Sequence, residues 1–173
     1  MAESMIRRAL PVLLFAIAVA SCASRGAVPR PFPSPGGAAV PEPSPAAPAA
    51  RAGGYAVAGT ALALRGAPYR EGGADPNGFD CSGFVQYVFG QHAVPMPRSV
   101  AEQARSGRAI EPGEIEPGDL VFFSTVSPGA SHVGIAIGGD EFVHAPSGRG
   151  EVRVERLSAP YWAQRFVGSR RVL

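Results

Sequence analysis

Residues 79–90 read FDCSGFVQYVFG, and this stretch decides the kind of domain that the chain forms. Its apolar residues stand at i, i+1, i+4 and i+5 counted from Phe84, which is the spacing of a helix with one buried face. Asp80 and Ser82, on either side of Cys81, are residue types that begin helices. The sequence therefore predicts a helix that starts at Cys81.

A cysteine at a helix start has chemical consequences. The unpaired N–H groups and the positive end of the helix dipole favour the thiolate over the thiol. We therefore expect Cys81 to be a nucleophile that is alkylated well below the pKa of ~8.5 of a free thiol. The structural alternative is a small core residue, because a lone cysteine among apolar neighbours is usually one.

The rest of the domain divides into helices first and strands second. A helix is predicted over 55–64, and Ser99 with Glu102 forms a capping box for a short helix over 99–106, whereas 69–79 has the composition of a loop. The expected strands are 120–124, 132–137, 141–144, 151–157 and 166–172. Helices packed on an antiparallel sheet of five to six strands make an α+β fold.

The strand region supplies two histidines. His132 opens one predicted strand and His144 ends the next, with a turn over 138–140 between them. If the turn is centred there, opposite residues have numbers that sum to about 277, so the two histidines lie close together across the hairpin. With Cys81 they can form a nucleophile, a general base and an orienting residue. The same three residues also suit a zinc site, and this alternative stays open.

Several ordered motifs carry a resemblance to a known family. They are Gly66-Ala67-Pro68-Tyr69-Arg70, Phe79-Asp80-Cys81-Ser82-Gly83-Phe84-Val85-Gln86, Pro97-Arg98-Ser99, Gly118-Asp119-Leu120-Val121-Phe122-Phe123, His132-Val133-Gly134-Ile135-Ala136-Ile137-Gly138 and Phe142-Val143-His144-Ala145. Together they resemble the NlpC-type murein endopeptidases, papain-like cysteine peptidases of bacterial cell walls. The resemblance covers 55–173 and implies a papain-like core with the nucleophile at a helix N-terminus.

The resemblance also implies roles for individual residues. It makes Cys81 the nucleophile, His132 the general base and acid, and His144 the residue that orients His132. It places the Tyr69 hydroxyl in the site beside the oxyanion. A buried aromatic in a turn is the alternative for Tyr69.

Four further residues have both a structural and a functional interpretation. Asp80 and Ser82 match positions that line the substrate cleft in some relatives, although Asp80 also suits a helix N-cap. Arg98 and Ser99 match a family pair to which we assign mainly structural roles, with Arg98 expected to bind a nearby acid. Trp162 is expected to be a packing residue.

The N-terminus has the features of an export signal. Residues 9–20 form an apolar run of signal-peptide length after two arginines, and Val19-Ala20-Ser21-Cys22 resembles a lipobox. We expect cleavage before Cys22, lipidation of its thiol and transfer to the outer membrane, with the folded domain facing the periplasm. Ordinary cleavage after Ala20 is the alternative.

Composition separates a tether from the folded part. Residues 23–54 include 9 Ala and 8 Pro among 32 positions and contain a single aromatic residue, so we expect a disordered tether. The predicted organisation is a signal peptide over 1–21, a lipidated tether over 22–54 and a catalytic domain over 55–173. That domain has 11 Arg and 12 acidic residues, which does not support nucleic-acid binding.

These observations lead to one expected function. We expect a monomeric cysteine peptidase, with no metal or cofactor, that hydrolyses murein stem peptides or cross-links at the D-alanyl–diaminopimelate bond. The γ-D-glutamyl–diaminopimelate bond is the alternative target. A catalytically silent wall-binding lipoprotein and an acyltransferase are the rivals from other classes.

Overall fold

The computed structural model describes residues 46–148 and 150–173. The predicted signal peptide, the lipidation site Cys22 and the tether up to residue 45 lie outside these residues. Within them, no helix combines the length and the hydrophobicity that a membrane span requires.

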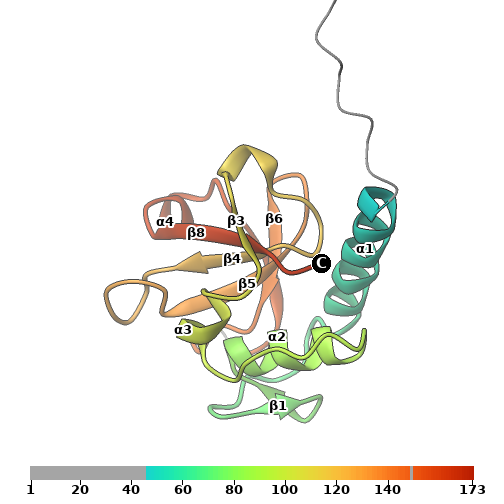
Figure 1. Cartoon of the computed structure of the whole chain (residues 1–173). Coiled ribbons are helices and arrows are strands. Elements are labelled where there is room, and N and C mark those ends of the chain that lie inside the picture. The colour runs from blue at the N-terminus through green and yellow to red at the C-terminus, as the bar shows by residue number, and fades with distance from the viewer. Residues whose placement is uncertain (1–45, 149) are drawn as a thin grey trace, which may run out of the picture. The chain divides into compact units, whose positions relative to one another are not determined.

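The centre of the domain is a six-stranded antiparallel sheet with the strand order β3-β8-β4-β5-β6-β7 (Figure 1). This confirms the predicted α+β class. The strands are β3 (Arg108–Ile110), β4 (Leu120–Phe123), β5 (His132–Gly138), β6 (Glu141–His144), β7 (Arg153–Arg156) and β8 (Phe166–Arg171).

In the described part of the chain, four α-helices accompany the sheet: α1 (Ala46–Ala63), α2 (Cys81–Gly90), α3 (Val100–Gln103) and α4 (Pro160–Ala163). The helix start at Cys81 and the Ser99 cap of α3 are confirmed. The helix predicted over 55–64 begins earlier in the structure, because 46–54, which the sequence predicted as tether, form the first turns of α1.

Glycines explain how α1 extends beyond its predicted start. A Cβ on Gly54 would lie 2.3 Å from the Pro117 carbonyl oxygen, and one on Gly118 would lie 2.5 Å from the Gly54 Cα. Gly118 also has a φ of +89°, which favours glycine. The helix backbone therefore lies directly against the turn before β4, a contact that composition alone does not reveal.

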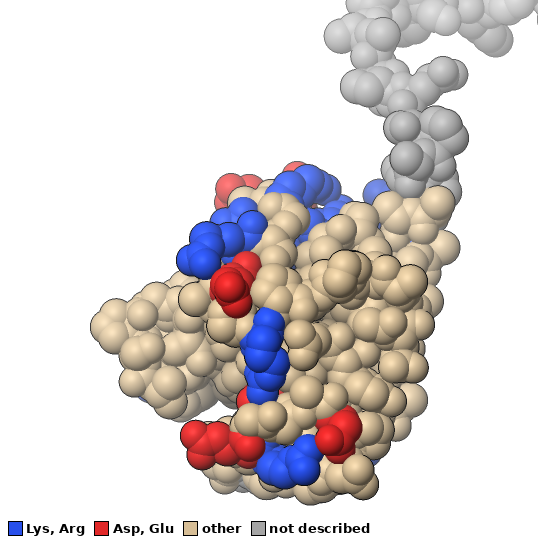
Figure 2. Space-filling model, turned by 60° about the horizontal axis from the view of Figure 1, so that its bottom comes forward, with Lys and Arg blue, Asp and Glu red and all other residues tan. Residues whose placement is uncertain are grey.

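The two faces of the sheet have different partners. Val133 and Ile135 of β5 belong to the core that α1 and α2 cover, whereas the alternate residue Ala136 lies in a second cluster with Phe142 and Trp162 of α4. Figure 1 shows α1 and α2 beside each other and α4 near β8. Acidic and basic side chains are interspersed on the face shown in Figure 2.

Two strand pairs were not predicted. The expected loop over 69–79 contains the hairpin of β1 (Ala74–Asp75) and β2 (Gly78–Phe79), and β3 pairs with β8. A short 3₁₀ turn, η1 (Pro112–Glu114), follows β3. His92, in the turn after α2, is half-buried with its Nε2 2.8 Å from the Thr60 hydroxyl.

Gly83 lets the first turn of α2 pack on the loop before β1. A Cβ at this position would lie 2.0 Å from the Gly73 carbonyl oxygen, so the backbone has to move. We expect Gly83→Ala to lower the free energy of unfolding by about 2 kcal/mol in urea titrations.

The matched control is Gly90→Ala at the exposed end of the same helix, where an added Cβ has nothing within 4 Å. This variant should be unchanged or up to about 1 kcal/mol more stable. Equal destabilisation by both substitutions would mean that helix propensity, not the contact with Gly73, decides the effect.

Candidate active site

Cys81 lies where the start of α2 meets β5. It is the first residue of the helix and half-buried, and the nearby backbone N–H groups of Val133, Ser82 and Cys81 itself favour its thiolate. Burial and the Asp80 carboxylate raise the pKa of the thiol, and these N–H groups only partly offset the rise. The raised pKa differs from the lowered pKa that the helix start predicted, because burial, and after it the negative charge of Asp80, disfavours the thiolate.

Asp80 holds the start of α2 and a nearby arginine. Its side chain accepts from the Gly83 N–H at 2.7 Å, from Arg98 Nη1 at 3.0 Å and from the Ser82 hydroxyl at 3.2 Å, and its second oxygen accepts from Arg98 Nη2. Burial opposes ionisation, but the Arg98 and Gly83 bonds outweigh it and keep the pKa of Asp80 below its usual range. Arg98 thus has the acidic partner that the sequence predicted.

The same network includes Ser82. Its side chain is buried, and its hydroxyl accepts from Arg98 Nη1 at 2.8 Å while donating to Asp80. These bonds give Asp80 and Ser82 a structural role at the base of the site. A contact of either residue with substrate stays a prediction.

The charge of Asp80 can be tested separately from its cap. Asp80→Asn keeps an oxygen that caps the helix but removes the negative charge and leaves the Arg98 cation uncompensated. We expect the pKa of Cys81 to fall, so iodoacetamide should react with it at lower pH than with the wild type. Asp75→Asn, which removes the same charge from an exposed pair with Arg70, is the control; an unchanged Asp80→Asn profile would contradict the argument.

His132 and His144 form a direct pair. The Nε2 atom of His132 lies 2.7 Å from Nδ1 of His144, and the rings are nearly perpendicular at 87°. Both side chains are buried, His144 completely. The predicted proximity of the two histidines is confirmed.

The register that joins them differs from the predicted one. Ile135 pairs with Val143 and Ala136 with Phe142, so opposite residues sum to 278, after a bulge between Ala136 and Gly138. Directly opposite residues share a face, and a register change of one moves a side chain to the other face. The predicted sum of 277 would have put His144 on the wrong face; the bulge places it diagonal to His132 on the same face.

Both imidazoles are neutral at pH 7. Burial lowers the pKa of His132 to about 4 and that of His144 to about 2, with His132 and Arg153 adding to the effect on His144. If His132 donates its Nε2 proton to His144, its Nδ1 atom is free to act as a base. His144 then carries its own proton on Nε2, a buried atom without a hydrogen-bond partner among the described residues.

This burial makes the fold sensitive to acid. An unfolded histidine binds a proton near pH 6.5, whereas folded His132 does so only near pH 4, so the unfolded state takes up more protons between these values. The free energy of unfolding should therefore fall by about 3 kcal/mol from His132 alone as pH drops from about 6.5 to 4. Urea titrations along this pH range test it; a flat profile in this window would contradict it.

An aromatic residue holds the histidine pair in place. The Trp162 indole stacks on His132 with centroids 5.5 Å apart at 23°, and it meets His144 edge to face at 4.9 Å. The sequence predicted packing for Trp162 but gave no signal for its partners, because α4 and the hairpin are distant along the chain.

Tyr69 is held beside the cysteine by backbone contacts. Its N–H donates to the Gly150 carbonyl at 2.7 Å, and it bridges to Phe79 just before the start of α2. Burial, with the charges of Cys81 and Asp80, raises the pKa of its phenol, so the hydroxyl stays a donor. The predicted position of Tyr69 at the site fits this geometry.

The zinc alternative does not fit the histidine geometry. Two nitrogens 2.7 Å apart in a direct hydrogen bond leave no room for an ion between them. In 46–148 and 150–173, no three His, Cys, Asp or Glu side chains are grouped to hold a metal ion.

The chain matches a known protein family over most of the described domain. The profile of the NlpC/P60 family matches residues 66–171. Over 110 residues the chain is 43% identical to the murein DD-endopeptidase MepS/murein LD-carboxypeptidase of Escherichia coli K12, covering 63% of this chain and 57% of that protein. It is 42% identical over 109 residues to a probable endopeptidase NlpC homolog of Haemophilus influenzae, with coverage of 62% and 57%.

A solved structure has the same fold. The NlpC/p60 domain of the peptidoglycan hydrolase SagA aligns with a TM-score of 0.60 at 34% identity, covering 68% of this chain and 97% of that one. The chain spans a little over half the length of the two curated relatives. Because the family profile matches more than half of its residues, the chain belongs to the NlpC/P60 family.

Proposed function

We propose that this protein is a cysteine endopeptidase that hydrolyses amide bonds in murein peptides. The observation that carries the proposal is a cysteine at a helix start beside a strand that presents a buried, hydrogen-bonded histidine pair. Thiol, base and orienting group are the parts that nucleophilic acyl transfer requires. The printed names of the relatives, a murein endopeptidase and a peptidoglycan hydrolase, support murein as the substrate.

The reaction follows from the protonation states. Nδ1 of His132 takes the thiol proton as Sγ of Cys81 attacks the carbonyl carbon, and His144 accepts from Nε2 of the imidazolium. N–H groups at the start of α2 and the Tyr69 hydroxyl donate to the oxyanion. His132 then gives its proton to the leaving nitrogen, the C–N bond breaks, and a thioester forms.

Hydrolysis of the thioester reverses these roles. His132 takes a proton from water as the water oxygen attacks the acyl carbon, and the C–S bond breaks. The acyl half leaves as a carboxylic acid and the thiol regains its proton. A neutral His132 is required at both attacks, which the lowered pKa of His132 provides at pH 7.

For the target bond we propose D-alanyl–diaminopimelate, in line with the DD-endopeptidase name of the Escherichia coli relative. The experiment is digestion of cross-linked and uncross-linked muropeptides followed by mass spectrometry, with Cys81→Ala as control. Conversion of cross-linked dimers into two intact stems supports the proposal, whereas fragments of uncross-linked stems that end at D-glutamate identify the γ-D-glutamyl bond. Binding without cleavage would support the silent wall-binding alternative.

The chemistry and the location have their own tests. Activity should persist in EDTA and be lost on alkylation, whereas activity restored by zinc would overturn the mechanism.

We also propose export and lipidation at Cys22, which anchors the domain at the outer membrane. Labelled palmitate should enter the wild type but not Cys22→Ala, and an inner-membrane or soluble location would contradict the anchor.

A further inference from the structure

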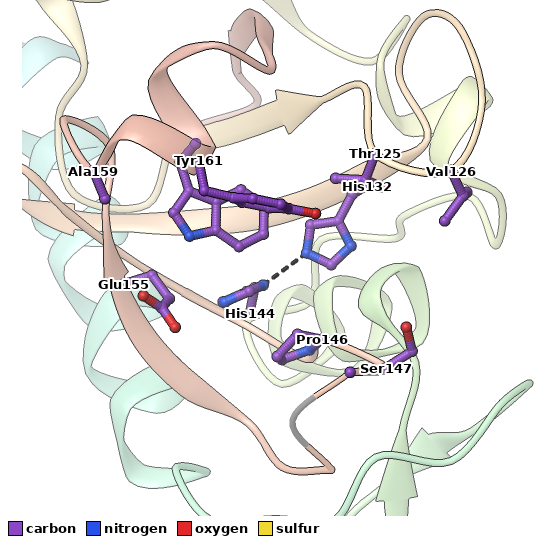
Figure 3. A pocket seen from close by; sticks show the side chains of 11 residues that line it. Thr125, Val126, His132, His144, Pro146, Ser147, Glu155, Ala159 and Tyr161 are labelled. Carbon is purple, nitrogen blue, oxygen red and sulfur yellow. Dashed lines mark hydrogen bonds between the residues drawn. The ribbon is translucent and has the colours of Figure 1, made fainter.

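A pocket of about 340 Å³ adjoins the histidine pair (Figure 3). It begins at His132 and His144 and continues between the β4–β5 loop, the segment after β6, and α4. None of its lining residues comes from α2, the helix that carries Cys81. The lining residues are Thr125, Val126, His132, His144, Pro146, Ser147, Gly148, Glu155, Ala159, Tyr161 and Trp162.

This position assigns the pocket to one half of the substrate. In the proposed mechanism the acyl half becomes bonded to Cys81, whereas the leaving nitrogen receives its proton from His132. A cavity that is lined by His132 but not by Cys81 therefore lies on the leaving side. It accommodates the residue that contributes the scissile nitrogen.

The pocket carries a single charge. Glu155 is the only lining residue with an ionised side chain at pH 7, because burial keeps both histidines neutral. Nε of Arg153 lies 2.9 Å from one Glu155 oxygen and holds the carboxylate in place, but Arg153 does not line the pocket. A ligand in the pocket thus contacts the Glu155 carboxylate and not the Arg153 guanidinium that pairs with it from outside the pocket.

A hydrogen-bond donor lies beside this carboxylate. Glu155 pairs with Phe142 across β6 and β7, which puts it on the same face as His144 and diagonal to it. Figure 3 shows the Glu155 carboxylate on the side of His144 that faces away from His132. The ring nitrogen of His144 that does not bond to His132 is Nε2, which is fully buried, has no partner among the described residues and carries a proton in the catalytic tautomer.

The His144 N–H and the Glu155 carboxylate together form a hydrogen-bond donor and acceptor that can bind an amide group. An amide C=O accepts from an imidazole N–H while its own N–H donates to a carboxylate, whereas a free carboxylate in the same place is repelled by Glu155. We infer that this pocket binds the leaving residue and selects one whose carboxyl group is present as an amide over one with a free carboxylate. The inference rests on the proposed function and deepens it.

The selection has a consequence for the reaction type. A carboxypeptidase releases a residue with a free carboxylate, so Glu155 disfavours that reaction and also disfavours any internal bond whose leaving residue keeps a free carboxylate beside the scissile nitrogen. At a D-alanyl–diaminopimelate cross-link, it favours a diaminopimelate whose neighbouring carboxyl group is amidated. At a γ-D-glutamyl bond, the peptide bond to the following residue supplies the amide.

The test uses two peptides with one acyl half, taken from whichever bond the muropeptide digestion identifies. Their leaving residues are D-alanine, with a free carboxylate, and D-alaninamide. We expect the wild type to hydrolyse the amide with a kcat/KM about 10-fold higher. Glu155→Gln should raise kcat/KM for the acid about 10-fold and change that for the amide less than about 3-fold.

Glu141→Gln removes the same charge from a residue that does not line the pocket and should leave both rates unchanged. Equal wild-type rates for the two peptides would overturn the inference. So would an equal loss on both peptides in Glu155→Gln, which would show that Glu155 acts through His144 instead of on the substrate.

Binding measurements distinguish a failure of the pocket's selectivity from a failure of the proposed hydrolysis. In Cys81→Ala, which cannot form the thioester, the amide peptide should bind about 10-fold more tightly than the acid. If the wild type hydrolyses neither peptide while this preference persists, the proposed hydrolysis is wrong and the selection by the pocket stands. If the preference is absent, the selection is wrong.

Discussion

Cys81→Ala is expected to abolish hydrolysis of murein peptides, with a loss in kcat on the order of 10⁴-fold or more, because the Ser82 hydroxyl, which also lies at the start of α2, is buried and bonded to Asp80 and Arg98. Cys81→Ser should be similarly inactive, since a serine hydroxyl is a far weaker nucleophile next to a neutral imidazole. Single-turnover and steady-state assays on the digested muropeptides measure both variants.

The folded state should tolerate these changes. Cys81 is only half-buried and has no disulfide partner in the described chain, so the midpoint of thermal unfolding should move little. Binding of uncleaved muropeptide to Cys81→Ala is the control for an intact site. Normal hydrolysis by Cys81→Ala would end the assignment as a cysteine peptidase.

His132 and His144 are expected to give graded losses. His132→Ala removes the base and acid and should lower kcat by about 10³- to 10⁴-fold. His144→Gln and His144→Asn keep an amide oxygen that accepts from Nε2 of His132 and should retain activity within about 10-fold of the wild type. His144→Ala removes the acceptor and should lie between these limits.

The order of the losses assigns the roles. If His132→Ala were milder than His144→Ala, the base and the orienting residue would have to be exchanged. If His144→Gln were as inactive as His144→Ala, the accepting oxygen would not be the property that matters. Thermal midpoints of all four variants separate these outcomes from unfolding.

Much of the fold follows from local sequence patterns. The helix at Cys81, the cap at Ser99 and the main strands depend on short-range spacing, which a sequence displays directly. The added strand β3 is only three residues long and pairs with the distant β8, so it has no local signal. The N-terminal extension of α1 depends on a backbone contact between Gly54 and the turn at Gly118, which no helical periodicity reveals.

The candidate site, like the fold, is predictable from the sequence only where local patterns determine it. The sequence indicated Cys81, His132 and His144 as a group, and the hydrogen bond between the histidines agrees with that grouping. The ionisation of Cys81 was mispredicted, because the helix start is local whereas the desolvation that raises the pKa comes from the packed core. Glu155 had no signal at all, since its relation to His144 depends on the pairing of β6 with β7.

The bulge between Ala136 and Gly138 fixes which face of the sheet each side chain of β6 lies on, His144 included. An insertion or deletion of one residue between the bulge and His144 would turn that side chain toward the face covered by α1 and α2, whereas a change of two residues would return it to the face of His132. Among functional homologues, length variation in this hairpin is therefore expected in even steps.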